Sequence, residues 1–159
     1  MIIPRIFFHK QYFRNFVQVF FIRMIHQIEF SLPEYRQGFH LITSEILSKI
    51  GELPLTGLLN IFVKHTSAGL TINENADSSV LSDFNTFFSD WIPENYPKFE
   101  HDYEGKDDMP AHIKASVVGQ SLTIPISEGR LNMGTWQGIY LCEFRRHGGR
   151  RKFVATIYS

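Results

Sequence analysis

The chain is organised around one polar stretch, His65-Thr66-Ser67-Ala68-Gly69-Leu70-Thr71-Ile72-Asn73-Glu74-Asn75-Ala76-Asp77. The residues before it, 57–63, form an apolar, β-branched run that predicts a strand. The residues after it, 80–91, carry apolar side chains at helical spacing and predict an amphipathic helix. We therefore interpret the stretch as a junction between strand and helix, where rigid elements hold polar groups and a helix N-terminus offers free N–H groups. A polar loop with a helix cap, for which Asn75 is the first candidate, is the alternative.

Outside the junction, the sequence predicts strands and two further helices. The apolar stripe of residues 80–91 is expected to lie in the core. The strands are expected at residues 25–30, 39–42, 121–127, 139–145 and 150–158, with the last two forming a hairpin, and the helices at residues 43–50 and 110–119. The fold class is α+β: a β-sandwich-like, mostly antiparallel sheet with about three helices in a single domain.

Composition excludes several classes of protein. The chain has 159 residues and 43% hydrophobic residues, which fits one folded domain. Sixteen basic and sixteen acidic residues balance, so we expect neither nucleic acid nor a membrane as a partner. A single cysteine, Cys142, excludes an intramolecular disulfide and is typical of a reducing compartment, so we expect a cytoplasmic protein. Because Cys142 lies in an apolar run, it is expected to be a small buried residue and not a nucleophile.

Residues 1–23 differ in composition from the rest. They are rich in phenylalanine, carry four Arg or Lys residues and hold no acid. A membrane span needs about 20 largely uncharged residues, and a signal peptide needs a cleaner apolar core, so neither fits. We interpret residues 1–23 as an atypical extension, disordered or not part of the native protein, with residues 24–159 as the domain. An amphipathic surface helix is the alternative.

Three histidines stand beside carboxylates or amides in the sequence: His65, His101 and His112. Imidazoles combined with carboxylates suit a divalent metal, Zn²⁺ or Mg²⁺, or a general acid–base pair. The neighbouring acids Asp107 and Asp108 offer oxygen ligands of the kind found where Mg²⁺ meets phosphates. The spacing matches no standard metal motif, so loop and capping roles are the alternative for all five residues.

Basic residues near these groups are few. Six of them are candidates to meet an anionic substrate, namely Lys64, Lys114, Arg145, Arg146, Arg150 and Arg151. A solvated hairpin end is the alternative, and we favour it for Arg150 and Arg151. The sequence contains no phosphate loop, no Gly-x-Ser-x-Gly elbow and no dinucleotide-binding glycine pattern. Ser67 follows His65 closely, but no acid is placed to orient a serine-hydrolase triad.

Three segments carry a family resemblance: residues 65–77, residues 104–114, and the pattern Ser121-x-x-Ile124-x-Ile126-x-x-Gly129-x-x-x-x-Gly134-Thr135-Trp136-Gln137-x-Ile139. Together they resemble the YjbQ family of secondary thiamine-phosphate synthase enzymes, over residues 24–159. The resemblance implies a compact homotrimer of small α+β domains. It also implies a transferase that joins hydroxymethylpyrimidine pyrophosphate to a thiazole phosphate and releases pyrophosphate. Because the family's activity is a secondary one, a different principal role stays open.

The same resemblance, extended by chemistry to His101, implies a shared polar pocket. The implied catalytic residues are His65, Asn73, Glu74, Asp77 and Gln137. The implied substrate-binding residues are Thr66, Ser67, Trp136, Ser116 and Lys114. The implied metal ligands are His65, His101, His112, Asp107 and Asp108. Two other functions are open: a different metal-dependent enzyme acting on a phosphorylated or heterocyclic small molecule, and a non-catalytic trimer that binds a ligand or metal.

Overall fold

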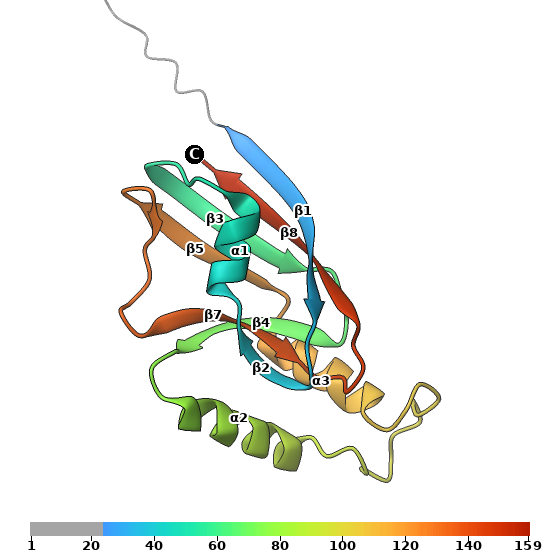
Figure 1. The fold of residues 1–159 in the computed structure, drawn as a ribbon. Coiled ribbons are helices and arrows are strands. Elements are labelled where there is room, and N and C mark those ends of the chain that lie inside the picture. Colours follow the sequence, from blue (N-terminus) through green and yellow to red (C-terminus); the bar gives the residue numbers. More distant parts are fainter. Residues whose placement is uncertain (1–23) are drawn as a thin grey trace, which may run out of the picture.

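The computed structural model of the protein describes residues 24–159 (Figure 1). The interpretations of residues 1–23 lie outside the described residues. In chain order the elements are β1 (Ile25–Glu34), β2 (Gly38–Leu41), α1 (Thr43–Ile50), β3 (Thr56–Val63), β4 (Ala68–Glu74), α2 (Ser78–Trp91), α3 (Asp108–Val118), β5 (Ser121–Ser127), β6 (Arg130–Leu131), β7 (Gln137–Glu143) and β8 (Arg150–Tyr158).

The strands form two antiparallel sheets, which confirms the predicted α+β class. The larger sheet has the order β1-β8-β3-β5-β6, and the smaller sheet has the order β2-β7-β4. In Figure 1, α1 lies across the larger sheet, while α2 and α3 lie beside the smaller one. Among the described residues, no helix is long and apolar enough to span a bilayer.

The smaller sheet is buried on both faces. Along β7, Ile139 and Leu141 point into the main core with α1 and the larger sheet. The alternate residues Tyr140 and Cys142 point into a second apolar cluster with α2 and α3. Cys142 is fully buried, as predicted, and burial raises the pKa of its thiol.

Two predicted connections are wrong. The prediction of a continuous polar junction misses β4, whose residues pair with β7 from Ala68–Glu143 to Glu74–Gln137. The predicted hairpin of the last two strands does not form, because β7 lies in the smaller sheet and β8 pairs with β1 and β3 in the larger one. The connection between them, residues 144–149, therefore crosses from one sheet to the other.

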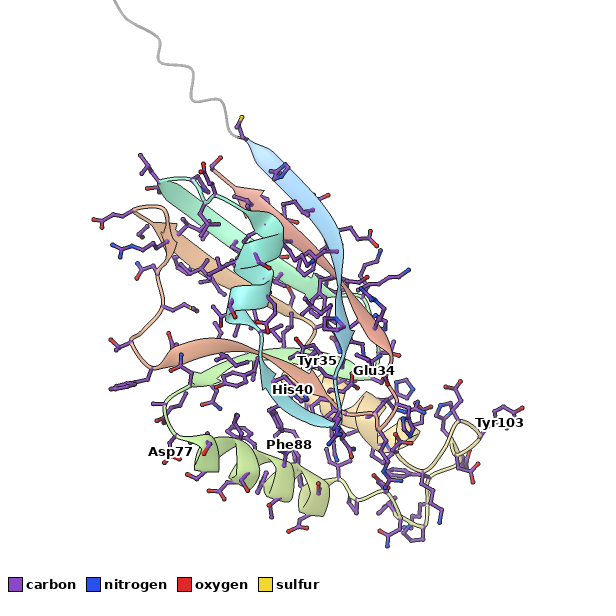
Figure 2. All side chains as sticks on the ribbon, in the orientation of Figure 1. Glu34, Tyr35, His40, Asp77, Phe88 and Tyr103 are labelled. Atoms are coloured by element: carbon purple, nitrogen blue, oxygen red, sulfur yellow. The ribbon has the colours of Figure 1, made fainter. Side chains whose placement is uncertain are left out.

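The apolar stripe of α2 is less buried than predicted. Phe88 alone of the α2 side chains is fully buried, and it points from α2 towards the smaller sheet (Figure 2). Leu81 and Phe84 pack partly against the same cluster. Phe87 and Trp91 keep 63% and 54% of their surface exposed, because they lie on the flank of α2 that no other element between residues 24 and 159 covers.

Candidate functional site

Two histidines and one aspartate converge at the start of α3. His101 comes from the loop between α2 and α3, while Asp108 and His112 lie one helical turn apart on α3. His101 Nε2 lies 2.7 Å from Asp108 Oδ2, and His112 Nε2 lies 3.5 Å from the same oxygen. One ligand atom from each residue lies within 4.8 Å of the other two. We call these residues the metal-site cluster.

The orientation of His112 is fixed by the chain before β4. His112 Nδ1 lies 3.1 Å from the main-chain oxygen of Thr66, a contact in which Nδ1 carries the proton and donates it. The unprotonated nitrogen is then Nε2, which faces Asp108. A hydrogen bond from the outer ring nitrogen to a carbonyl is the usual support of a metal-binding histidine.

Arg145 holds the acidic residues of the site from the β7–β8 connection. Its Nη1 contacts Asp108 Oδ1, its Nε donates to Asp107 Oδ2 over 3.1 Å, and its Nη2 donates to the main-chain oxygen of Glu104 over 2.9 Å. Asp108 is 1% exposed, so this contact compensates a buried carboxylate. Sequence reasoning named Arg145 only as a cation for an anionic substrate and missed this role.

Asp107, a predicted metal ligand, lies outside the cluster. Its Oδ2 accepts the Arg145 side chain and also the main-chain N–H of Arg146, over 3.0 Å. Burial alone would raise the pKa of Asp107, but these two contacts outweigh it and hold the pKa below its ordinary value. The Asp107 carboxylate therefore binds the Arg145 side chain and the main chain of Arg146, and not the metal-site cluster.

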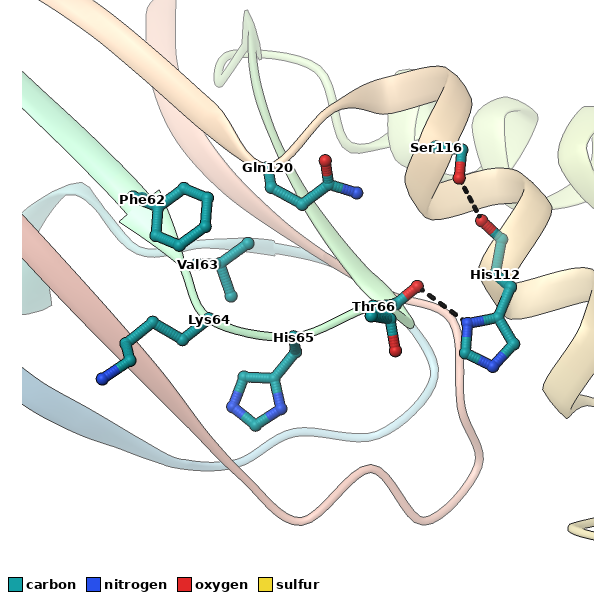
Figure 3. A pocket seen from close by; sticks show the side chains of 8 residues that line it. All are labelled: Phe62, Val63, Lys64, His65, Thr66, His112, Ser116 and Gln120. Atoms are coloured by element: carbon teal, nitrogen blue, oxygen red, sulfur yellow. Dashed lines mark hydrogen bonds between the residues drawn. The ribbon is translucent and has the colours of Figure 1, made fainter.

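An open pocket of about 650 Å³ lies beside the cluster (Figure 3). His112 belongs to both the pocket and the metal-site cluster. The lining comes from strand β3, the segment after it, helix α3 and the residues just beyond α3. It consists of Phe62, Val63, Lys64, His65, Thr66, His112, Ser116 and Gln120. The predicted substrate-binding residues Thr66 and Ser116 thus lie in one pocket with His112.

His65 lines this pocket but lies outside the metal-site cluster. Its Nε2 accepts the main-chain N–H of Lys152 over 2.8 Å, and its Nδ1 lies 3.2 Å from Arg151 Nη1. Partial burial lowers the pKa of His65, Arg151 and Lys152 lower it further, and Glu143 opposes them. The predicted metal role of His65 does not fit this arrangement, because both ring nitrogens already face protein donors.

A buried ion pair supports the wall behind His65. Arg151, predicted to be solvated, is 3% exposed and binds the fully buried Glu143. Arg151 Nη2 also contacts the hydroxyl of Ser67, 3.3 Å away, and Glu143 Oε1 accepts the main-chain N–H of Arg145 over 2.9 Å. Ser67 is therefore buried behind the pocket and is not one of its lining residues.

The remaining predicted residues lie at the far end of β4. Glu74 pairs with Gln137 there, and Ala68 at the near end is roughly 20 Å away at the usual rise of about 3.3 Å per residue. The Gln137 side chain closes its own loop by accepting the N–H of Gly134 over 2.7 Å. Trp136 is 64% exposed. Within one chain, the residues at the two ends of β4 therefore do not line one pocket.

Side chains at this far end have local roles. Asn73 Oδ1 accepts the main-chain N–H of Glu74 over 2.8 Å. Asp77, and not Asn75, caps α2, since its Oδ1 accepts the N–H of Ser79 over 2.8 Å. Hydrogen bonding to the Ser79 side chain, and then to the Ser79 main-chain N–H, lowers the pKa of Asp77. Asn75 instead donates to the main-chain oxygen of Gln137, 3.3 Å away.

Lys114 is buried on α3 and does not line the pocket. Burial lowers the pKa of its ammonium group, and the charge of Glu94 opposes that shift. A substrate in the pocket is therefore not in reach of Lys114.

The donor set of the cluster fits zinc better than magnesium. Two imidazole nitrogens and one carboxylate oxygen are a common set of protein ligands in catalytic zinc sites, which keep a further position open. Mg²⁺ prefers an all-oxygen shell. A zinc ion held by these residues would have an open position for water or substrate, and the adjacent pocket is consistent with that.

Comparisons with known proteins place these features in a family. Residues 27–159 match the family model described as "UPF0047 protein YjbQ-like". The UPF0047 protein YjbQ of Salmonella typhimurium is 53% identical over 136 residues, covering 84% of this chain and 98% of that protein. The UPF0047 protein YjbQ of Escherichia coli O157:H7 is 48% identical over the same share of both chains.

Solved structures agree with the fold. A YjbQ/UPF0047 family protein of Clostridium acetobutylicum has a TM-score of 0.68 and 38% identity, over 83% of this chain and 99% of that one. A YbjQ-like protein of unknown function from Sulfolobus solfataricus has a TM-score of 0.74 over 86% and 99% of the two chains, and at 23% identity it supports the fold alone. The family model covers nearly all of the described residues, and the chain therefore belongs to the UPF0047 YjbQ-like family.

Proposed function

We propose that the protein is a zinc-dependent enzyme that acts on a small molecule bound in the pocket beside the metal-site cluster. The observation that carries this proposal is the convergence of His101 Nε2, Asp108 Oδ2 and His112 Nε2 next to a pocket that His112 also lines. A zinc ion with an open position polarises a substrate oxygen or lowers the pKa of a bound water.

Residues around the cluster prepare its ligands. Thr66 leaves His112 Nε2 unprotonated and facing the site. Arg145 occupies Asp108 Oδ1, so Oδ2 is the oxygen that remains for the metal. His65, with its lowered pKa, is a neutral imidazole on the pocket wall.

The specific reaction that we propose for assay is the one that the family resemblance suggests, as a side activity. The C–O bond between the pyrimidine methylene and pyrophosphate breaks, the thiazole nitrogen forms a C–N bond to that methylene, and pyrophosphate leaves. Trp136 and Gln137 lie at the opposite end of β4 from the cluster. In this proposal, Trp136 and Gln137 of one chain reach the metal-site cluster of a neighbouring chain in a homotrimer.

The test of the zinc proposal is metal content. Purified protein, dialysed against zinc and then buffer, is expected to retain about one zinc per chain. His101→Ala and His112→Ala should lose it, whereas His26→Ala, which changes an exposed histidine on β1, should retain it. Undiminished zinc in both cluster variants would overturn the proposal.

Assays of the zinc-loaded protein test the reaction. Thiamine-phosphate formation should be present in the wild type and lost in His112→Ala. If the trimer completes the site, mixing and refolding His112→Ala with Trp136→Ala subunits should restore activity, and light scattering should give the mass of a trimer. Bound zinc without thiamine phosphate would leave the metal enzyme in place and remove this substrate.

A further inference from the structure

We infer that the pocket beside the cluster receives a neutral part of the substrate that carries hydroxyl or amino groups, such as a sugar or polyol, and does not receive a phosphate. This inference rests on the proposed function, because it takes the cluster as the reaction centre. It specifies which part of the substrate lies in the pocket beside the metal-site cluster.

The first argument is charge. Among the described residues, Lys64 is the lone lysine or arginine of the lining, and its Nζ donates to Glu29 over 2.9 Å. His65 already faces Arg151 and the main chain of Lys152, so a protonated ring would add a charge next to existing positive charges. Phosphate sites ordinarily use unpaired Arg or Lys side chains or a helix N-terminus.

The second argument is the direction of α3. The pocket is lined by Ser116 and Gln120, which lie at and beyond the last turn of the helix. The carbonyl end of a helix carries partial negative charge and disfavours an anion. The opposite end of α3, at Asp108, belongs to the metal-site cluster.

The third argument is the balance of donors and acceptors. The hydroxyl of Ser116 donates its single proton to the main-chain oxygen of His112 over 2.8 Å, which leaves lone pairs free to accept. The Gln120 Nε2 donates to the main-chain oxygen of Ala115 over 3.0 Å, and its Oε1 has no protein partner among the described residues. Beside the second N–H of Gln120 and the hydroxyl of Thr66, the wall therefore offers free acceptors, which match ligand O–H and N–H groups.

The fourth argument is the apolar part of the lining. Phe62 is 43% exposed at the end of β3 and flanks the pocket together with Gln120 (Figure 3). The C–H face of a pyranose ring packs well on an aromatic ring while its hydroxyls reach polar atoms at the edge. A volume of about 650 Å³ holds a monosaccharide with room for an oxygen to approach His112.

The test uses two probes that share a phenyl ring: phenyl β-D-glucopyranoside and phenyl phosphate. Each is titrated into the zinc-loaded full chain and followed by amide chemical shifts in NMR. The glucoside should shift the amides of Phe62 and Gln120, with a dissociation constant on the order of 1 mM. Phenyl phosphate should leave these two amides unchanged, even where it reaches the metal.

Variants assign the effect to the pocket. Gln120→Leu removes the acceptor and should weaken glucoside binding about fivefold, while Gln120→Glu keeps an acceptor and should stay within about twofold of the wild type. Phe62→Leu should weaken binding, and Leu58→Ala, which removes an exposed apolar side chain on the same face of β3 outside the pocket, should not.

Two results overturn the inference. One is phenyl phosphate that shifts Phe62 and Gln120 and binds at least as tightly as the glucoside. The other is a zinc-loaded protein in which the glucoside shifts neither amide. Failure of the wild type to bind zinc is a separate result and contradicts the proposed function instead.

Discussion

The guanidinium of Arg151 and the carboxylate of Glu143 form two parallel hydrogen bonds, Nε to Oε2 and Nη2 to Oε1, both 2.6 Å long. The pair joins the end of β7 to the start of β8, and so it links the two sheets at the point where the chain crosses between them. Arg151 contacts His65, which lines the pocket, and Ser67 behind it. Glu143 accepts the main-chain N–H of Arg145, the residue whose side chain contacts Asp108.

Breaking one side of this pair should destabilise the protein strongly. Arg151→Met leaves the Glu143 carboxylate buried without its partner, which ordinarily costs about 3–5 kcal/mol. The double variant Glu143→Leu with Arg151→Met should recover a large part of that loss, because no buried charge remains. Chemical denaturation measures both. The matched control is Glu29→Gln, which breaks the exposed pair with Lys64 and should cost far less stability than Arg151→Met. An Arg151→Met penalty as small as the control's would contradict the prediction.

Gly148→Ala should also be destabilising, and the double variant should relieve it. A Cβ on Gly148 would contact Arg151 Nη2 and would lie 2.6 Å from both oxygens of Glu143. Overpacking of this kind costs about 1–3 kcal/mol. In the background of Glu143→Leu with Arg151→Met the neighbouring side chains are shorter, so the penalty of Gly148→Ala should shrink. Equal penalties in the two backgrounds would show that the ion pair is not what Gly148 accommodates.

Asp77→Ala should affect stability and leave zinc binding unchanged. The Asp77 side chain caps α2, and loss of such a cap lowers the free energy of unfolding. Asp77→Ser, which keeps a capping oxygen, should restore most of that free energy of unfolding. Zinc affinity, measured by competition with a chelating dye, should match the wild type in both variants. A fall in zinc affinity would instead indicate that Asp77 takes part in the metal site.

Stability should fall in mild acid because of His65. Burial, followed by Arg151 and Lys152, lowers the pKa of His65 below 6.5 in the folded state, with Glu143 opposing. The unfolded chain then binds the proton more readily, so the stabilisation is present above about pH 6.5 and is lost as the pH falls through the folded-state pKa. Denaturation curves between about pH 7 and about pH 5 should show this decline.

His65→Gln should flatten the pH dependence, since glutamine does not titrate in this range. His26→Gln, at an exposed position of β1, serves as the control and should keep the wild-type slope. If His65→Gln and wild type decline in parallel, another group causes the loss.

Part of the candidate site was readable from the sequence. His101, Asp108 and His112 are all predicted as metal ligands, and the structure brings these three together. The separation of Asp108 and His112 by four positions places them on one face of α3, and this spacing can be recognised in the sequence alone. The partner of Asp108 was not readable, because Arg145 is 37 residues away and reaches it only through the fold.

By itself, the sequence determined the types of most elements, with strand β4 as the main exception, and the burial of Cys142. Strands and helices repeat their side-chain directions every two and about 3.6 residues. These periods can be recognised from residues that are close in the sequence. It also supplied the motifs that resemble the family to which the chain belongs.

Only the tertiary structure decided which strands pair and which motif residues meet. The apolar run of β7 is compatible with a hairpin to β8, but β7 is buried on both faces and pairs with β2 and β4 instead. Because residues 68–74 form an extended strand and not a loop, His65 and Glu74 lie near opposite ends of β4. The burial of Arg151 follows from the same long-range pairing, since Glu143 reaches it only when the two sheets are assembled.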